Sequence, residues 1–550
     1  MYLENINSPA DVKAVGIDKL DVLAGEVRSH LLQKLSDHGG HIGPNLGMVE
    51  ATVALHYVFN SPIDKMVFDV SHQSYAHKML TGRKDAFLNP AEYDEVSGYT
   101  EPSESEHDQF VVGHTSTSVS LACGLAKGRD LKGGKENVIA VIGDGSLSGG
   151  EALEGLDMAA ELDTNIIIVV NDNQMSIAEN HGGLYKNLQL LRETNGGAQC
   201  NLFKAMGLDY VYVGEGNNVK ALVEAFQKVK DTTRPVVVHI NTVKGKGYKF
   251  AEEQKERFHW GFPFVIETGE TKKEYQFGPD FGVHTAQMLL DEMQKDPAVV
   301  ALTAGTPGIW GWNAEMRQKA GKQFVDVGIA EETAVAMSSA MAKRGAKPVF
   351  GGTITGLNDV THLGFYDITL LCNIPNMVYL APTCKEEYDA MLRWSIHQTE
   401  HPVAIRVPNI PLDSTNDTVA EENYGNLNRY QITHKGSEIA ILGLGGYYAL
   451  AQKVAEKYKE KGIDATVINP RFITGLDTAL LQDLQNGHHT VITLEDGQLD
   501  GGWGEKIARF YGNTPMKVRC YGARKEFVDR FDYNDFLRSN HLTAEQIAED

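Results

Sequence analysis

VIAVIGDG at residues 138–145 and NIIIVVNDN at residues 165–173 are the two stretches that decide the fold. Each begins as a nearly continuous run of β-branched apolar residues and ends in polar ones, a pattern typical of a parallel strand buried on both faces. Residues 149–162 between them are consistent with a crossover helix, which completes a βαβ unit. PVVVHI at residues 235–240 predicts another strand, and residues 20–35 have helical spacing. The first part of the chain is therefore expected to be an α/β domain.

Two polar stretches divide the rest of the chain into further α/β segments. We interpret residues 266–280 and 411–430 as linkers, which predicts domains at residues 1–265, 281–410 and 431–550. A length of 550 residues fits about three domains of ordinary size. Later strands are expected at residues 298–305, 323–331, 376–383, 438–446, 465–471 and 490–496, and a helix at residues 333–343.

Composition excludes several classes of protein. A formal net charge of −22 argues against a nucleic-acid surface, which would be basic. No apolar run approaches the roughly 20 residues needed to cross a bilayer, and no signal peptide is visible at the N-terminus. The five cysteines are scattered and form no CxxC pair, which favours a reducing compartment. A cytoplasmic protein with small-molecule substrates is expected.

The two polar motifs predict a magnesium and diphosphate site. Asp144 follows the first strand, and Asn171 and Asn173 follow the second, so all three are expected at the same carboxyl edge of the sheet. Carboxylate and amide oxygens suit octahedral Mg²⁺ that also holds phosphate oxygens. Gly145 lets backbone approach a diphosphate, towards which the helix beginning near Ser148 would point its N-terminus. The alternative is that both motifs are polar turns at strand ends.

The GDG and NDN pair is similar to the fingerprint of thiamine-diphosphate enzymes, and longer motifs resemble the 1-deoxy-D-xylulose-5-phosphate synthase family, relatives of transketolase. The resemblance covers nearly the whole chain. It is carried by GGHIGPNLGM (39–48), DVSHQSYAHKMLTGRKD (69–85), VGHTSTSVS (112–120), NDNQMSIAEN (171–180), KGKGYKFAE (244–252), DVGIAEE (326–332), THLGFYD (361–367), PVAIRVP (402–408) and TLEDGQLDGGWG (493–504).

The resemblance implies a fold and a reaction. The fold would be α/β, with two thiamine-diphosphate-binding parallel-sheet domains and a transketolase C-terminal domain, assembled as a homodimer. The reaction would be the condensation of pyruvate with glyceraldehyde 3-phosphate and loss of CO₂, which serves isoprenoid and thiamine biosynthesis. The cofactors would be thiamine diphosphate and Mg²⁺.

The resemblance also implies roles for individual residues. Asp144, Asn173 and the carbonyl of Met175 would bind Mg²⁺. The cofactor would be contacted by Gly145, Ser146, His72, Gly113, His114, Thr115, Tyr248 and Asn173.

Glu331 is expected to contact the aminopyrimidine ring. A carboxylate on the ring nitrogen N1′ favours the imino tautomer, which removes the C2 proton of the thiazolium. Glu331 must then be protonated or share a proton, and an apolar pocket would raise its pKa in that direction. The alternative is a glutamate that merely caps a helix N-terminus.

Histidines and an arginine complete the candidate site. His41, His72 and His259 are predicted to act on the substrate or intermediate, since imidazole exchanges protons near neutral pH. Arg406 is predicted to form a bidentate contact with the acceptor phosphate, with His362 and Lys78 as weaker candidates. The alternative is that Arg406 forms an ordinary surface ion pair. His77 is interpreted as a packing or surface residue.

The chain departs from the family pattern and is identified as a short, divergent member. Pro44 stands in GPNLG near the reacting centre, Thr333 in AEET replaces a histidine, and residues 181–201 are shortened. A strand–helix–strand stretch is missing at residues 350–351, so that either the sequence lacks an internal segment or the protein has lost part of its pyrimidine pocket. These departures leave open another ketol transfer with a different donor or acceptor, or a non-catalytic paralogue.

Overall fold

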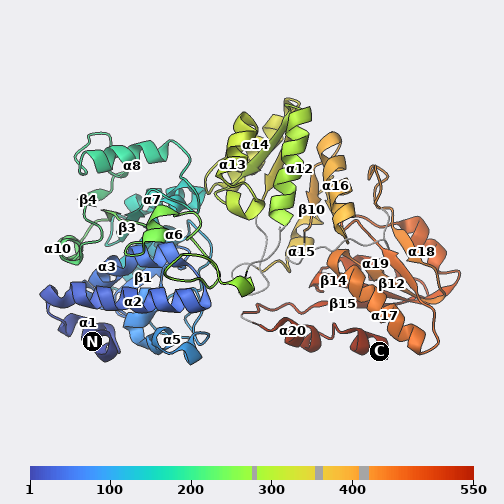
Figure 1. Cartoon of the computed structure of the whole chain (residues 1–550), viewed down its shortest axis with the longest axis horizontal. Coiled ribbons are helices and arrows are strands. Elements are labelled where there is room, and N and C mark those ends of the chain that lie inside the picture. Colours follow the sequence, from blue (N-terminus) through green and yellow to red (C-terminus); the bar gives the residue numbers. More distant parts are fainter. Residues whose placement is uncertain (276–280, 353–362, 408–419, 530) are drawn as a thin grey trace. The chain divides into compact units, whose positions relative to one another are not determined.

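The computed structural model describes residues 1–275, 281–352, 363–407, 420–529 and 531–550, which form two compact units (Figure 1). The first unit contains residues 1–346 and 350–352, and the second contains residues 347–349 and 353–550. The predicted middle domain, residues 281–410, is therefore divided between the two units.

The first unit is built on a parallel sheet in the order β1-β2-β3-β5-β4. Its strands are β1 (Lys65–Phe68), β2 (Val138–Gly143), β3 (Ile167–Asp172), β4 (Asp209–Val213) and β5 (Val236–Asn241). The helix α7 (Gly150–Leu162) connects β2 to its neighbour β3, so the predicted βαβ unit is confirmed. The strand β3 extends two residues beyond the predicted end, because β5 continues beside it and pairs Asn241 with Asp172.

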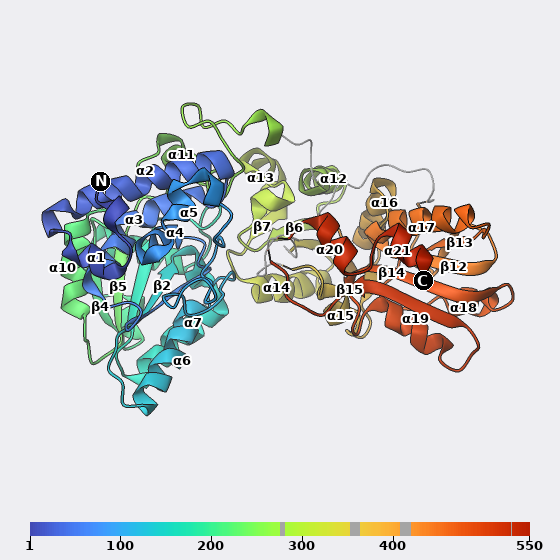
Figure 2. The ribbon, with the colours of Figure 1, turned by 90° about the horizontal axis from the view of Figure 1, so that it is seen from below.

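Both faces of this sheet are covered by helices, as the apolar strands require. Successive side chains of a strand point to opposite faces. In β2, Ile139 and Val141 pack in the core cluster that contains residues of α2 and α3, whereas Ala140 and Ile142 pack in the one that contains residues of α6 and α7. Figure 2 shows α2 and α3 on one side of the sheet and α6 and α7 on the other.

The helices of the first unit up to residue 253, besides α7, are α1 (Pro9–Ala14), α2 (Leu20–His38), α3 (Ile42–Val58), α4 (Tyr75–Lys78), α5 (Asp85–Leu88), α6 (Ser118–Leu131), α8 (Leu184–Glu193), α9 (Leu202–Ala205), α10 (Val219–Val229) and α11 (Lys249–Glu253).

A smaller sheet has the order β7-β6-β8. It contains β6 (Val299–Thr303), β7 (Phe324–Asp326) and β8 (Lys347–Gly351), with helices α12 (Phe281–Lys295), α13 (Ala314–Ala320) and α14 (Glu331–Lys343). Within α14 the buried residue is Ala334, and Val335 is 55% exposed.

The second unit has a mixed sheet in the order β11-β13-β12-β14-β15, in which β11 is antiparallel to β13 and the other pairs are parallel. β9 and β10 form a separate parallel pair, and β9 is hydrogen-bonded to the segment that follows β13. The elements are β9 (Val378–Leu380), β10 (Val403–Ile405), β11 (Gln431–His434), β12 (Glu438–Gly443), β13 (Thr466–Asn469), β14 (His488–Gln498), β15 (Lys517–Ala523), α15 (Asp367–Leu371), α16 (Lys385–His397), α17 (Tyr448–Glu460), α18 (Thr478–Leu484), α19 (Trp503–Tyr511), α20 (Tyr533–Ser539) and α21 (Ala544–Glu549).

Among the described residues, no helix is both long and apolar enough to cross a membrane.

Candidate active site

The two polar motifs meet at the carboxyl edge of the first sheet. Asp144 is buried directly after β2, and its backbone N–H donates to the carbonyl of Asn171 over 3.0 Å. The backbone N–H of Asn173 lies 3.5 Å from Asp144 Oδ1, and Asn173 Oδ1 accepts from the backbone N–H of Met175 over 3.1 Å. The structure therefore brings together the three residues expected to hold Mg²⁺.

Two glycines let neighbouring loops approach the backbone closely at this edge. A Cβ atom on Gly145 would lie 2.9 Å from Ser176, and one on Gly149 would lie 2.0 Å from Ser116 Oγ. Side chains at either position would therefore displace a neighbouring loop. Ser116 Oγ also donates to the carbonyl of Ser146 over 2.8 Å, which holds residues 113–115 close to the GDG loop. Gly113 and Thr115 thus lie near Ser146, with His114 exposed.

Unpartnered polar atoms line the same edge. Asn180 Oδ1, Ser176 Oγ and Thr117 Oγ1 are buried and have no hydrogen-bond partner among the described residues. Burial together with the charge of Asp172 raises the pKa of Asp144, and a bound cation would favour its ionised form. Among the described residues, no group of three or more His, Cys, Asp or Glu side chains is arranged so that it could hold a metal ion by itself. One carboxylate with amide and carbonyl oxygens is nevertheless a hard-oxygen donor set, and it fits Mg²⁺ with a diphosphate.

Lys244 is a site residue that the sequence-based prediction missed. Its ammonium donates to the carbonyl of Ser176 over 2.5 Å, and burial lowers its pKa to about 7, although the charge of Asp144 opposes this. It follows β5, and that position at the carboxyl edge is the signal that could have identified it. A buried cation at this point suits an anionic ligand.

The three histidines predicted to act on the substrate form one cluster. The ring centroids of His41 and His72 are 4.8 Å apart, those of His72 and His259 are 5.3 Å apart, and those of His41 and His259 are 5.7 Å apart. Burial and the nearby charge of Lys244 lower the pKa of His72 to about 3, and the same two causes lower that of His259 well below its usual value. Lys244 thus acts electrostatically on both the imidazole cluster and the Asp144 edge.

The depressed pKa of His72 predicts a pH-dependent stability. Below pH 6.5 the unfolded chain binds a proton at this imidazole, whereas the folded protein does so only near pH 3. The free energy of unfolding should therefore fall as the pH falls from 6.5 towards 3, by at most about 1.4 kcal/mol per pH unit, the limit for one titrating group. Urea unfolding at pH 7.5 and 5.5 should show a smaller fall for His72→Asn than for wild type. His489→Asn, at an exposed site, is the control, and equal slopes for wild type and His72→Asn would contradict the prediction.

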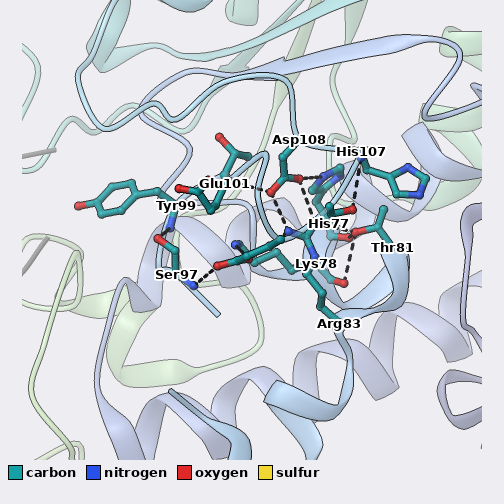
Figure 3. Close-up of polar contacts among 12 residues, drawn as sticks. His77, Lys78, Thr81, Arg83, Ser97, Tyr99, Glu101, His107 and Asp108 are labelled. Atoms are coloured by element: carbon teal, nitrogen blue, oxygen red, sulfur yellow. Dashed lines mark hydrogen bonds and ion pairs between the residues drawn. The ribbon is translucent and has the colours of Figure 1, made fainter. Parts of the chain in front are cut away.

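A buried ion-pair network supports the loop that follows α5 (Figure 3). Arg83 donates from Nη1 and Nη2 to the two oxygens of Asp108 over 2.7 and 2.9 Å, and Lys78 donates to Glu104 over 2.5 Å. His77 Nε2 lies 2.8 Å from Asp108 Oδ1, and the His77 side chain is fully buried. The placement of His77 agrees with its interpretation as a packing residue.

This network positions Tyr99 beside the imidazole cluster. Glu104 accepts from the backbone N–H of Ser97 over 2.5 Å, and Ser97 Oγ accepts from that of Tyr99 over 3.2 Å. In Figure 3 the Tyr99 ring points away from the ion pairs, and its centroid lies 6.0 Å from that of His41. Sequence reasoning missed Tyr99, because nothing in the loop distinguishes it from a surface residue.

Glu331 is the first residue of α14 and is exposed. The apolar pocket expected around it is not formed by the described residues. The segment before the helix does reach the GDG loop, because Ser148 Oγ donates to the carbonyl of Ile329 over 3.2 Å. This contact brings the backbone that leads to Glu331 to the diphosphate edge.

Tyr248 and Arg406 have other partners in the described structure, and His362 is not among the described residues. Tyr248 packs in an aromatic cluster with Phe258, and its hydroxyl donates to the carbonyl of Ile266 over 3.0 Å. Arg406, in the second unit, donates to Asp367 over 2.6 Å and to Asp496 over 2.5 Å, so it forms an ion pair, although a largely buried one rather than the surface pair of the alternative.

Comparison with known sequence families defines the class of protein. Residues 120–317 match the transketolase thiamine diphosphate binding domain, and residues 428–547 match the transketolase C-terminal domain. Residues 3–200 match the family described as 1-deoxy-D-xylulose-5-phosphate synthase. The chain is thus a thiamine-diphosphate-dependent enzyme of the transketolase type, a transferase.

Individual relatives narrow this class to one family. The 1-deoxy-D-xylulose-5-phosphate synthase of Symbiobacterium thermophilum is 35% identical over 622 residues, covering 100% of this chain and 94% of that protein. That of Clostridium tetani is 34% identical over 616 residues, covering 100% and 98%. The crystal structure of transketolase from Campylobacter jejuni matches at 16% identity over 97% of this chain and 99% of that one, with a TM-score of 0.41. The chain belongs to the 1-deoxy-D-xylulose-5-phosphate synthase family.

Proposed function

We propose that this enzyme condenses pyruvate with glyceraldehyde 3-phosphate, giving 1-deoxy-D-xylulose 5-phosphate and CO₂. Family membership supports the reaction. The position of one lysine supports the assignment of the reaction to the Asp144 edge and the histidine cluster. A buried lysine, Lys244, lies against the Asp144 edge and acts electrostatically on His72 and His259. Groups that can bind a diphosphate and groups that can exchange protons are therefore adjacent.

The residues of the chain divide the work of this reaction. Asp144, Asn173 and the Met175 carbonyl would hold Mg²⁺, while Lys244, Gly145 and Ser146 hold the diphosphate. Thiamine diphosphate, when bound, supplies the carbon nucleophile and the electron sink. His41, His72 and His259 accept or donate protons at the oxygens of the substrates. Glu331 would hydrogen-bond the pyrimidine nitrogen N1′.

The acceptor phosphate needs a cation. Arg406 and His362 remain the proposed residues, and Arg406 would have to exchange one of its two aspartate partners for the phosphate.

The proposal includes a homodimer in the cytoplasm. Trp260 and Phe262 are 48% and 40% exposed and their rings are in contact, which is typical of an interface. None of the five cysteines, all of which lie in the described residues, forms a disulfide, which agrees with a reducing compartment.

Product analysis tests the proposed reaction. Purified enzyme with thiamine diphosphate, Mg²⁺, pyruvate and glyceraldehyde 3-phosphate should form 1-deoxy-D-xylulose 5-phosphate, and Glu331→Ala should lower the rate by about a hundredfold or more, since general acid–base groups contribute about 10²–10⁴-fold. Glu332→Ala is the matched control, because Glu332 is the adjacent exposed glutamate in the same helical turn. Turnover of ketose phosphates alone would favour a different ketol transfer, and the absence of cofactor-dependent CO₂ release would favour a non-catalytic paralogue.

A further inference from the structure

Residues 180–192, in the part of the chain that is shortened, contact the GDG loop. Asn180 Nδ2 donates to Asp144 Oδ2 over 2.6 Å. The hydroxyl of Tyr185, in the first turn of α8, lies 3.2 Å from the carbonyl of Asp144 and 3.3 Å from that of Gly145. The backbone that presents the Asp144 carboxylate is therefore held by a side chain from a neighbouring helix.

The other end of α8 holds the NDN motif. Arg192 Nη1 donates to Oδ2 of the fully buried Asp172, which also lies 2.9 Å from His239 Nε2. The second oxygen, Oδ1, accepts from the backbone N–H of Gln174 over 3.2 Å. Gln174 has a φ of 65°, a conformation that needs support in a residue other than glycine. Arg192 thus stabilises the turn that follows Asn173.

The geometry of α8 lets one helix reach both motifs. Tyr185 and Arg192 are seven residues apart, so they lie on the same face about two turns, or about 10 Å, from each other. Leu188 and Leu191 are fully buried in the core cluster that contains Ile168 of β3. The helix is therefore fixed to the strand that carries the NDN motif, and its polar side chains have defined positions.

We propose that α8 is a clamp on the cofactor site, in which Tyr185 and Arg192 are positioning residues. Tyr185 holds the loop of Asp144, and Arg192, acting through Asp172, holds the turn of Asn173 and Met175. Neither side chain is assigned as a ligand of the metal or of the diphosphate. The clamp sets the affinity of the site for Mg²⁺ and thiamine diphosphate, and this inference rests on the proposed cofactor site.

Calorimetric titration of the full-length protein with Mg²⁺, at a fixed thiamine diphosphate concentration, tests the clamp. Tyr185→Phe removes the hydroxyl alone and should weaken Mg²⁺ binding about three- to tenfold. Arg192→Met should weaken it about tenfold or more, the loss typical of a residue that orients a metal ligand, and Arg192→Lys should restore part of it. Lys186→Ala, at an exposed position of the same helix, should bind as wild type does.

The melting temperature without cofactor separates positioning from a purely structural role. Under the clamp inference, Tyr185→Phe without cofactor melts at the wild-type temperature. When Mg²⁺ and thiamine diphosphate are added, its melting temperature rises by less than that of the wild type. Wild-type Mg²⁺ affinity in both Tyr185→Phe and Arg192→Met would overturn the clamp and leave the proposed function intact. A wild-type protein that binds no thiamine diphosphate in the presence of Mg²⁺ would overturn the proposed cofactor site and the clamp together.

Discussion

Asp144→Asn should lower the rate of the cofactor-dependent reaction by more than about a hundredfold. Asp144 is the only carboxylate in the proposed Mg²⁺ ligand set, so its loss leaves the cation with neutral protein oxygens. Removing a residue that merely orients a metal ligand typically lowers metal affinity or activity about 10–100-fold, so removing a ligand itself should lower activity further. Initial rates of CO₂ release at saturating Mg²⁺ and thiamine diphosphate measure the effect.

The same substitution should leave the metal-free protein at least as stable as wild type. Burial raises the pKa of Asp144, which means that its ionised form is unfavourable in the absence of a cation. The melting temperature without cofactor should therefore not fall, while the increase caused by Mg²⁺ and thiamine diphosphate should disappear. Asp157→Asn, an exposed aspartate on α7, is the matched control. Cofactor-dependent stabilisation that survives in Asp144→Asn would exclude Asp144 as the ligand.

The edge that carries Asp144 was predictable because it depends on strand periodicity and on order along the chain. Two buried strands joined by a crossover helix are parallel when they share a sheet, and consecutive strands are usually neighbours, so the polar residues after them are expected at one edge. The contribution of Lys244 depends on β5 lying next to β3, and one sequence does not give that strand order. Local motifs thus specify which polar residues follow each strand. The order of the strands in the sheet determines which of these residues lie next to each other.

The direction of individual side chains was the least predictable property. Tyr248 lies in a motif that resembles a cofactor contact, yet its ring packs between other aromatic rings and its hydroxyl satisfies the Ile266 carbonyl. Arg406 was open to two interpretations, and the two nearby aspartates favour the ion pair. Both outcomes depend on neighbours that are distant in sequence, such as Asp496, and no local pattern reports them.

The departures in the middle of the chain have a structural counterpart. β7 ends at Asp326, opposite the last residue of β6, although the apolar pattern predicted a strand up to residue 331. Beyond that point Asp326 Oδ1 accepts from the backbone N–H groups of Gly305 and Gly328, each over 2.9 Å, and this turns the chain away from the sheet. The alignment with the Symbiobacterium relative is 622 residues long, whereas this chain has 550, so part of the relative's matched region has no counterpart here.

Arg83→Met should destabilise the first unit by about 3–5 kcal/mol, the cost typical of removing one partner from a buried ion pair. In the wild type, Arg83 and Lys78 balance Glu104 and Asp108, and all four side chains are at most 11% exposed. Without the guanidinium, two buried carboxylates share one ammonium, and the bidentate contact to Asp108 is lost. The free energy of unfolding from urea titration at pH 7.5 measures the change.

The surface pair formed by Arg234 provides the comparison that makes this prediction specific to burial. Arg234 lies 3.4 Å from Asp163 with about half of its side chain exposed, so Arg234→Met should change the free energy of unfolding by less than about 1 kcal/mol. Equal effects of the two substitutions would show that the buried network adds no more stability than a surface pair. Because the network supports the loop of Tyr99, Arg83→Met should also lower the reaction rate at temperatures where the variant is still folded, whereas Arg234→Met should not. Retention of the wild-type rate by a destabilised Arg83→Met would mean that the ion pairs stabilise the fold without positioning Tyr99 beside His41.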